Sequence, residues 1–373
     1  MDKRLLLASP HMSDEGYELQ YIQDAFQKNW IAPLGENVNE LEKAMGAYLG
    51  GGYPVALSAG TAALHLAMVL AGVSAGDTVF CQSLTFSASA NPIAYLGAKP
   101  IFIDSERETW NMDPAALRRA FELHGTPKAV VAVHLYGNPA KLDELGALCR
   151  EYGTLLIEDA AEALGSAYNG QKCGTFGAFG ALSFNGNTLI TSSGGGMLLC
   201  RSEETANHAL KLATQARERA PWYQHEEIGY NYRMSNISAG IGRGQMKVLL
   251  LRVRQKQAIF ARYSENLKGL PITMQPKLAC AEPNRWLSVL LLDSGCGVTP
   301  ADVLARLEKE NIEGRYLWKP MNMQPVFADE PFVGVSDAPV CSELFARGVC
   351  LPSDTKMSMD DVDRVSAVIR ELF

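Results

Sequence analysis

The chain has 373 residues, of which 47% are hydrophobic, so it holds enough apolar material to bury one or two cores. Its formal net charge is −7 and it has no run of Lys or Arg, which argues against a nucleic-acid partner. No signal peptide is apparent, and no stretch reaches the roughly 18–20 apolar residues of a membrane helix. The eight cysteines are scattered without a CxxC pair, which argues against a metal site and a disulfide framework. We therefore expect a cytoplasmic protein with a small-molecule ligand and no membrane partner.

Between about residues 54 and 200, short apolar runs rich in β-branched residues alternate with stretches of helical periodicity. The predicted strands cover 78–82, 99–104, 129–137 and 154–161, and the predicted helices cover 63–71, 114–125 and 141–153. Strands that alternate with helices indicate βαβ units, so we predict an α/β fold with a mostly parallel central sheet.

The rest of the chain has a different pattern. The elements predicted there are two strands within 183–200, one long helix at 239–267, a strand at 286–293, and helices at 300–310 and 359–372. We predict a large α/β domain over residues 1–250 and a smaller C-terminal α+β domain over residues 251–373.

The first candidate site is the segment Ser58-Ala59-Gly60-Thr61, which precedes an apolar helical stretch. The start of a helix leaves backbone N–H groups free, and these groups together with the helix dipole attract anions. The segment therefore suits a phosphate, although an ordinary capped helix start is the more common use of such a sequence. Phe86 follows a predicted strand and is placed to stack on a flat ring, but a single Phe is more often part of a core.

Acidic residues end the predicted strand 154–161, where Glu158, Asp159 and Glu162 stand. An acid at the end of a buried strand is costly unless a partner compensates its charge. A protonated pyridine nitrogen is one such partner, and Asp commonly faces it in enzymes that use pyridoxal phosphate (PLP). A metal ligand or a helix cap explains the same residues equally well.

Two further polar segments complete the pattern. Ser183 and Asn185 offer hydrogen bonds, and the glycine run 194–196 allows close approach of the backbone, although by itself this segment is a polar hairpin. Asn231 and Arg233 lie among tyrosines before the long helix, where they suit either an anion or the capping of that helix.

The order and spacing of these segments resemble the DegT/StrS family of sugar aminotransferases, which belong to the fold-type I PLP superfamily. Within this family the chain is most similar to the UDP-4-keto-sugar 4-aminotransferases of the bacillosamine pathway. The matching segments are HLYGN (134–138), EDAAEALGS (158–166), SFNGN (183–187), TQARE (214–218), YNYRMSN (230–236) and NRWLS (284–288). The resemblance extends from Ser9 to Ser353 and implies the fold-type I fold with a small C-terminal domain.

The resemblance also implies roles for individual residues. The cofactor, PLP or its amine form pyridoxamine phosphate (PMP), would be held by Ala59, Gly60, Thr61, Phe86, Asp159, Glu162, Ser183, Asn185 and Asn231. Asp159 would face the pyridine nitrogen, Glu162 would lie near the ring hydroxyl, and Asn231 would reach the phosphate of a neighbouring subunit. The implied assembly is therefore a homodimer with shared active sites. The nucleotide-sugar side is implied to involve Trp30, Arg233, Arg285, Arg315 and Lys319.

The chain departs from the family at its catalytic centre, because Thr188 stands where the family has a lysine. That lysine forms the Schiff base with PLP and then moves protons, and a threonine hydroxyl can do neither well near neutral pH. No lysine lies within fifteen residues of Thr188, the nearest upstream being Lys172. A local replacement is not visible in the sequence.

The function implied is transfer of an amino group from L-glutamate to a UDP-linked 4-keto-6-deoxy-N-acetylhexosamine. With Thr188 at the lysine position, this protein is expected to be inactive or to trap a cofactor–sugar adduct. Two alternatives stay open: a non-catalytic protein that binds PLP or a nucleotide sugar, and a PMP-dependent sugar dehydratase. The dehydratase is less favoured because such relatives carry His at the position of Thr188. A nicotinamide oxidoreductase would need a G-x-G-x-x-G motif after the first strand, which the sequence lacks.

Overall fold

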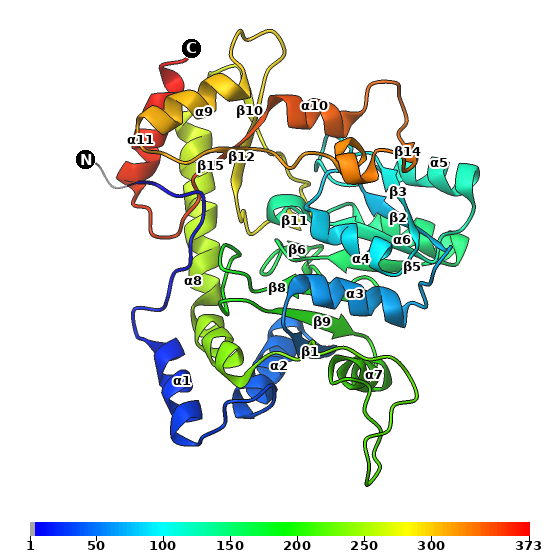
Figure 1. Ribbon diagram of the computed structural model, residues 1–373. Helices are drawn as coiled ribbons and strands as arrows, with labels where there is room; N and C mark the ends of the chain where they lie inside the picture. The colour runs from blue at the N-terminus through cyan, green and yellow to red at the C-terminus, as the bar shows by residue number, and fades with distance from the viewer. Residues whose placement is uncertain (1–3) are drawn as a thin grey trace.

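The central feature of the molecule, a computed structural model that describes residues 4–373, is an eight-stranded sheet (Figure 1). In spatial order its strands are β1 (Tyr53–Leu57), β9 (Gly196–Cys200), β8 (Phe179–Ser183), β5 (Leu155–Asp159), β4 (Ala129–Val133), β2 (Thr78–Gln82), β3 (Lys99–Ile103) and β14 (Phe332–Val333). β9 runs antiparallel to both of its neighbours, and the pairs from β8 to β14 are parallel. The predicted α/β fold with a mostly parallel sheet is confirmed.

Helices cover both faces of this sheet because successive strand residues point to opposite sides. Val79 and Cys81 of β2 join one apolar core together with α3 (Gly60–Leu70) and α7 (Glu203–Ala213). Phe80, between them, joins a second core. The helices of that second core are α5 (Pro114–His124) and α6 (Leu142–Tyr152), and the short α4 (Asn91–Tyr95) lies beside α3. The continuous apolar runs in the strands follow from this burial on two faces.

The C-terminal part forms a second layer of structure above the large sheet (Figure 1). Its antiparallel sheet has the order β10 (Ile272–Met274), β12 (Ser288–Leu292), β15 (Gly348–Leu351) and β13 (Arg315–Tyr316). Its helices are α9 (Pro300–Lys309), α10 (Val340–Arg347) and α11 (Met359–Arg370). A third, small sheet has the order β11 (Ala281–Glu282), β6 (Ala167–Tyr168) and β7 (Gln171–Lys172), so it joins the two parts of the chain.

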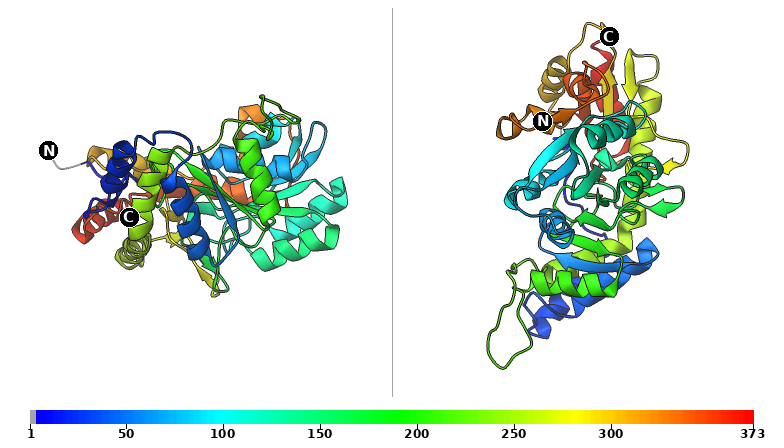
Figure 2. Two further views of the ribbon diagram at one scale, coloured as in Figure 1. Left: turned by 90° about the horizontal axis from the view of Figure 1, so that it is seen from below. Right: turned by 90° about the vertical axis from the view of Figure 1, so that its right-hand side faces the viewer.

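The long helix α8 (Asn236–Asn266) connects the two parts, as the sequence predicts. It runs along one side of the molecule, with α1 (Tyr17–Gln27) and α2 (Glu36–Leu49) packed against its first half (Figures 1 and 2). The expected boundary at residue 250 therefore lies inside a helix. β14 also returns from the C-terminal part to the edge of the large sheet, beside β3.

A long segment between α7 and α8 extends away from the body of the protein, as the green loop in Figures 1 and 2 shows. Three large apolar side chains of this loop are exposed, Trp222, Tyr223 and Ile228. Within residues 4–373, no helix is both long enough and apolar enough to cross a membrane.

Candidate active site

A pocket of about 320 Å³ opens where parallel strands of the large sheet end. Ligands of open parallel sheets bind at this edge, because loops from several strands converge there. The pocket brings together nine of the residues that the sequence singled out: Ala59, Gly60, Thr61, Phe86, Asp159, Glu162, Ser183, Asn185 and Thr188.

The start of α3 forms the anion-binding end of the pocket. Its N-cap residue, Ala59, is extended and has no side chain to cap the helix, so no side-chain acceptor takes up the N–H groups of the first turn. These groups and the helix dipole suit a phosphate. Glycine at position 196 is required here, since a Cβ on Gly196 would lie 2.3–2.5 Å from backbone atoms of Ala59 and Gly60. The glycine run was expected to allow close approach of the backbone, and in the structure it lets β9 lie against the start of α3.

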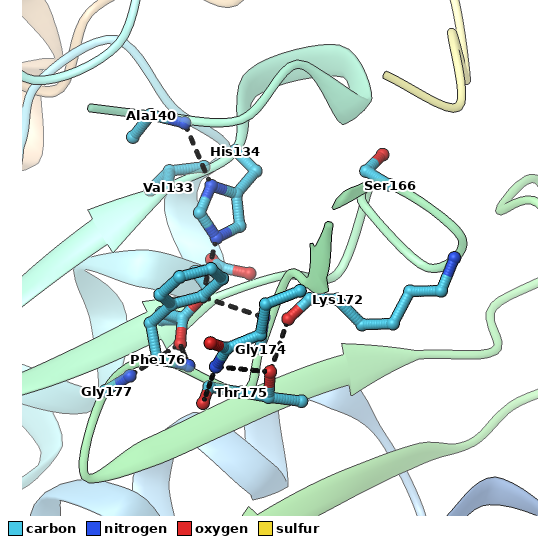
Figure 3. A network of polar contacts seen from close by, with 12 residues as sticks. Val133, His134, Ala140, Ser166, Lys172, Gly174, Thr175, Phe176 and Gly177 are labelled. Carbon is cyan, nitrogen blue, oxygen red and sulfur yellow. Dashed lines mark hydrogen bonds and ion pairs between the residues drawn. The ribbon is translucent and has the colours of Figure 1, made fainter. Parts of the chain in front are cut away.

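Two adjacent carboxylates at the end of β5 point in opposite directions and have opposite environments. Glu158 faces a buried network, shown in Figure 3, in which it accepts hydrogen bonds from the amides of Gly174, Phe176 and Gly177 at 2.7, 2.5 and 2.6 Å. The ring of His134 lies 3.0 Å from Glu158 Oε2, and its Nδ1 accepts from the amide of Ala140, so Nε2 carries the proton. Burial acts to raise the pKa of Glu158, but His134 and the amides outweigh it and the pKa is lowered. Glu158 is therefore a structural carboxylate.

Asp159, by contrast, faces the pocket without a cationic partner among residues 4–373. It is 6% exposed, and its oxygens accept hydrogen bonds from Ser89 Oγ at 2.6 Å and from the amide of Ala161 at 3.1 Å. Burial raises the pKa of Asp159, and these two donors offset the effect only in part. A buried carboxylate in this state is suited to a protonated ring nitrogen. Among residues 4–373 there is no group of three or more His, Cys, Asp or Glu side chains that could hold a metal ion.

The residues present therefore fit PLP at both of its ends. The uncapped start of α3 suits the phosphate, and the buried carboxylate of Asp159 suits the pyridine nitrogen. A cofactor of this kind requires an anion site and a carboxylate in one pocket, and the pocket is lined by both.

Glu162 and two aromatic rings form another wall of the pocket. Glu162 accepts hydrogen bonds from the amide of Tyr136 at 2.5 Å and from the indole N–H of Trp318 at 3.0 Å. Burial raises the pKa of Glu162 to about 8 in spite of these donors. The Phe86 ring lies 5.3 Å from the ring of Trp318, and its side chain is 54% exposed in the open pocket. A flat ligand can therefore cover Phe86 without displacing any core packing.

Thr188 sits in a tight turn at the rim of the pocket. Its hydroxyl lies 2.8 Å from two backbone oxygens, those of Asn185 and Ile190, and can donate to one of them at a time. The indole N–H of Trp286 donates to the backbone oxygen of Asn187 at 2.6 Å and braces the same turn. The hydroxyl is thus committed to the turn itself.

The remaining candidates from the sequence lie outside this pocket. Trp30 is 48% exposed and borders a separate groove near the start of α2. Asn231 is exposed and forms an isolated backbone bridge with Thr214. Arg315 is paired with Glu313 at 2.8 Å, and Lys319 is partly exposed.

Two arginines predicted to meet a substrate anion are instead occupied within the protein. Arg233 forms an ion pair with Glu42 and donates to the backbone oxygen of Ala56 at 3.1 Å. Arg285 is 5% exposed, lies over the ring of Phe260 and donates to the backbone oxygen of Gln275 at 3.0 Å. Burial lowers the pKa of Arg285 to about 10. In the single chain neither side chain reaches the pocket.

Three residues that shape the pocket were not predicted from the sequence: Ser89, Trp286 and Trp318. Both tryptophans are close in sequence to a selected cation, because Trp286 follows Arg285 and Trp318 precedes Lys319. An indole has a large apolar surface and a single donor, which makes it a common wall of a ligand site. A tryptophan next to a selected cation could therefore have been predicted as a wall of the pocket.

Known proteins resemble the chain over nearly its whole length. The sequence model of the DegT/DnrJ/EryC1/StrS aminotransferase family matches residues 13–370. EpsN of Bacillus subtilis (strain 168), which is named for PLP-dependent aminotransferase activity, is 51% identical over 100% of this chain and 97% of its own. GDP-perosamine synthase of Caulobacter vibrioides is 32% identical over 99% of this chain and 98% of its own. The crystal structure of DesI in the presence of its TDP-sugar product has a TM-score of 0.90 at 26% identity and covers 100% of this chain and 93% of that chain.

Proposed function

Because the chain belongs to the DegT/DnrJ/EryC1/StrS aminotransferase family of PLP-dependent sugar aminotransferases, we propose that its pocket serves amino transfer from L-glutamate to a UDP-linked 4-keto-6-deoxy-N-acetylhexosamine. We further propose that Thr188 makes this form turn over very poorly. The observation that carries both statements is one pocket that gathers the uncapped start of α3 and the buried carboxylate of Asp159, while the lysine position is a threonine.

The chain's own residues have separable tasks in this proposal. When bound, PLP or PMP supplies the carrier for the amino group and an electron sink. The first turn of α3 binds its phosphate, Asp159 keeps the proton on the ring nitrogen, and Phe86 offers its open face to the ring. Thr188 leaves the reaction without a general base at this position, and general acid–base catalysis is typically worth about 10²–10⁴ in rate.

The UDP group and the sugar rest on the sequence resemblance to the bacillosamine-pathway enzymes. The named relatives differ in their nucleotides, since one is a GDP-perosamine synthase and another was solved with a TDP-sugar. UDP-, GDP- and TDP-linked 4-keto sugars should therefore be compared side by side, and the proposal requires a preference for UDP.

A homodimer with shared sites also belongs to the proposal. The exposed position of Asn231, away from the pocket of its own chain, supports a role toward a partner's pocket. Sedimentation of the whole protein tests the dimer, and mixing Asp159→Asn chains with Asn231→Ala chains, both in the Thr188→Lys background, tests the sharing. Recovered activity in the mixture is the expected result. A cytoplasmic location is supported by the eight cysteines, all of which are free thiols.

The deciding experiment measures amine transfer by this protein, by its Thr188→Lys variant and by Thr188→Met as a control of similar length without an amine. We expect turnover from the lysine variant alone. Equal turnover by the parent and the lysine variant would show that Thr188 is not disabling. If none of the three turns over any of the sugars while PLP still binds, the amino-transfer proposal fails and a non-catalytic binding protein is favoured.

A further inference from the structure

Lys256 is a largely buried lysine that the function described so far does not use. It lies on α8, is 3% exposed, and makes no hydrogen bond or ion pair with any residue in the described range 4–373. The nearest compensating charge is Asp354, whose carboxylate already accepts hydrogen bonds from the Ser9 hydroxyl and from the amide of Lys356. Lysines are almost never fully buried unless they are paired, so the position of this amine requires an explanation.

Lys256 lines a small cavity of about 10 Å³ that the turn carrying Thr188 also lines. Gly186, Leu189 and Thr355 are among the other residues around this cavity. Across residues 4–373, Thr188 is the one residue that lines both this cavity and the cofactor pocket. Val253, one helical turn before Lys256, shares an apolar core with Leu189, which holds this face of α8 against the turn.

The environment of Lys256 favours its neutral form. Burial lowers the pKa of the amine to about 7, and the charge of Asp354 opposes this effect only in part. His11 is the other ionisable residue of the described range that lines this cavity, Arg252 donates to the backbone oxygen of His11 at 3.2 Å, and Lys356 lies beside Asp354. At neutral pH a large fraction of this amine is therefore unprotonated, which is the form that acts as a nucleophile.

We propose that Lys256 supplies the amine missing at position 188, by passing the turn 185–190 and joining covalently to the carbonyl carbon of PLP. The inference deepens the proposed function and depends on its cofactor site, but not on the identity of the sugar. The turn contains Gly186 and is held by the hydrogen bonds of Thr188 and of Asn187, which must break for the side chain to pass.

The reaction is an ordinary condensation. The nitrogen of Lys256 attacks the aldehyde carbon, a carbon–nitrogen double bond forms, and the aldehyde oxygen leaves as water with the two amine protons. Nothing is oxidised or reduced. Borohydride then adds hydride to the new double bond and makes the link permanent, so the attachment site can be located independently of any enzymatic turnover.

The test incubates the whole protein with PLP, reduces it with borohydride, and locates the pyridoxyl-phosphate group by peptide mass spectrometry. Lys256→Arg keeps a cation but cannot form the imine, and Lys256→Met keeps the volume without an amine. Thr188→Lys is the positive control, in which the label must appear at position 188. Circular dichroism and Tm confirm that each variant is folded.

We expect the label at Lys256 in the parent protein. In both Lys256 variants we expect the total pyridoxyl-phosphate label per chain to fall at least tenfold. A parent protein that binds PLP but carries no label at Lys256, or carries it on another lysine, overturns the inference. If Thr188→Lys transaminates while the parent leaves Lys256 unlabelled, this inference fails and the proposed function stands. If Thr188→Lys does not bind PLP, the proposed function has failed as well.

Discussion

Trp318 donates its indole N–H to Oε1 of Glu162 at 3.0 Å, and this bond ties the C-terminal part of the chain to the wall of the cofactor pocket. The second oxygen of Glu162 accepts from the amide of Tyr136. One wall of the pocket therefore carries a carboxyl group whose pKa is raised by burial. Through its two hydrogen bonds this carboxyl group links Trp318 of the C-terminal part to Tyr136 of the large domain.

Glu162→Gln should change how the stability of the cofactor-free protein depends on pH. Burial raises the folded-state pKa of Glu162 from 4.5 to about 8, so between these values the folded protein binds more protons than the unfolded chain. The contribution of Glu162 to the free energy of unfolding is therefore highest at low pH and falls as the pH rises toward about 8. Thermal unfolding of both proteins from pH 5 to 9 should show a steeper loss of Tm in the parent, with a difference on the order of a few °C. Parallel curves would contradict the prediction.

Asp159→Asn should leave the protein folded but weaken its hold on the cofactor. The substitution removes the charge that faces the ring nitrogen, and a hydrogen bond to a charged group is worth about 1.5–3 kcal/mol, or roughly 10–100-fold in affinity. Because burial raises the pKa of Asp159 in the empty pocket, the cofactor-free variant should be at least as stable as the parent. Titration with PLP and with PMP, followed by absorbance, measures the affinity. Ser89→Ala removes one donor to Asp159 and should give a smaller loss.

Glu158→Gln, next to Asp159 in the sequence, should destabilise the fold. Glu158 is fully buried and satisfies three backbone amides and His134, so loss of its charge should cost about 3–5 kcal/mol of unfolding free energy. Urea denaturation measures this cost. Its lowered pKa also means that the stabilisation is present at neutral pH and is lost as the pH falls below the ordinary glutamate range, so the variant should lose less stability in acid. A variant as stable as the parent at pH 7 is the contrary outcome.

Gly196→Ala should damage the phosphate end of the pocket. The added Cβ would meet backbone atoms of Ala59 and Gly60 at 2.3–2.5 Å, which forces β9 away from the start of α3. We expect about 1–3 kcal/mol of destabilisation and weaker binding of PLP. Gly194→Ala is the matched control, because its Cβ would meet no atom within 4 Å. Equal stability and equal PLP affinity of the two variants would contradict the predicted steric clash at position 196.

Arg233→Met should reduce stability and leave the preference among nucleotide sugars unchanged in the Thr188→Lys background. Arg233 is paired with Glu42, whose carboxylate also accepts the amide of Ala56 at 2.7 Å, so the pair braces β1 against α2. Removing one partner should cost about 2–4 kcal/mol of unfolding free energy. Glu42→Gln and the double variant complete a mutant cycle, and a coupling of about 1 kcal/mol or more is expected. A changed nucleotide preference would assign Arg233 to the substrate.

The sequence by itself determined the family, the α/β fold and most of the pocket. Strands such as Thr78–Gln82 and helices such as Pro114–His124 have a local pattern of burial that a single chain shows directly. Asp159 and Ser183 end parallel strands and Gly60 begins the helix after a strand, and parallel strands bring their carboxyl ends to one edge. The absence of the catalytic lysine at Thr188 is likewise a fact of the sequence.

The tertiary structure decided which charges are free and which are occupied. Glu158 and Asp159 are neighbours in sequence, and only the packing shows that one is satisfied by amides while the other faces the pocket. Arg233 and Arg285 look available in the sequence, yet their partners, Glu42 and Phe260, come from other elements. Lys256 lies 68 positions beyond Thr188 along the chain. It lines the same cavity as Thr188 because Val253 of α8 packs in one core with Leu189, and no local pattern encodes a contact at that separation.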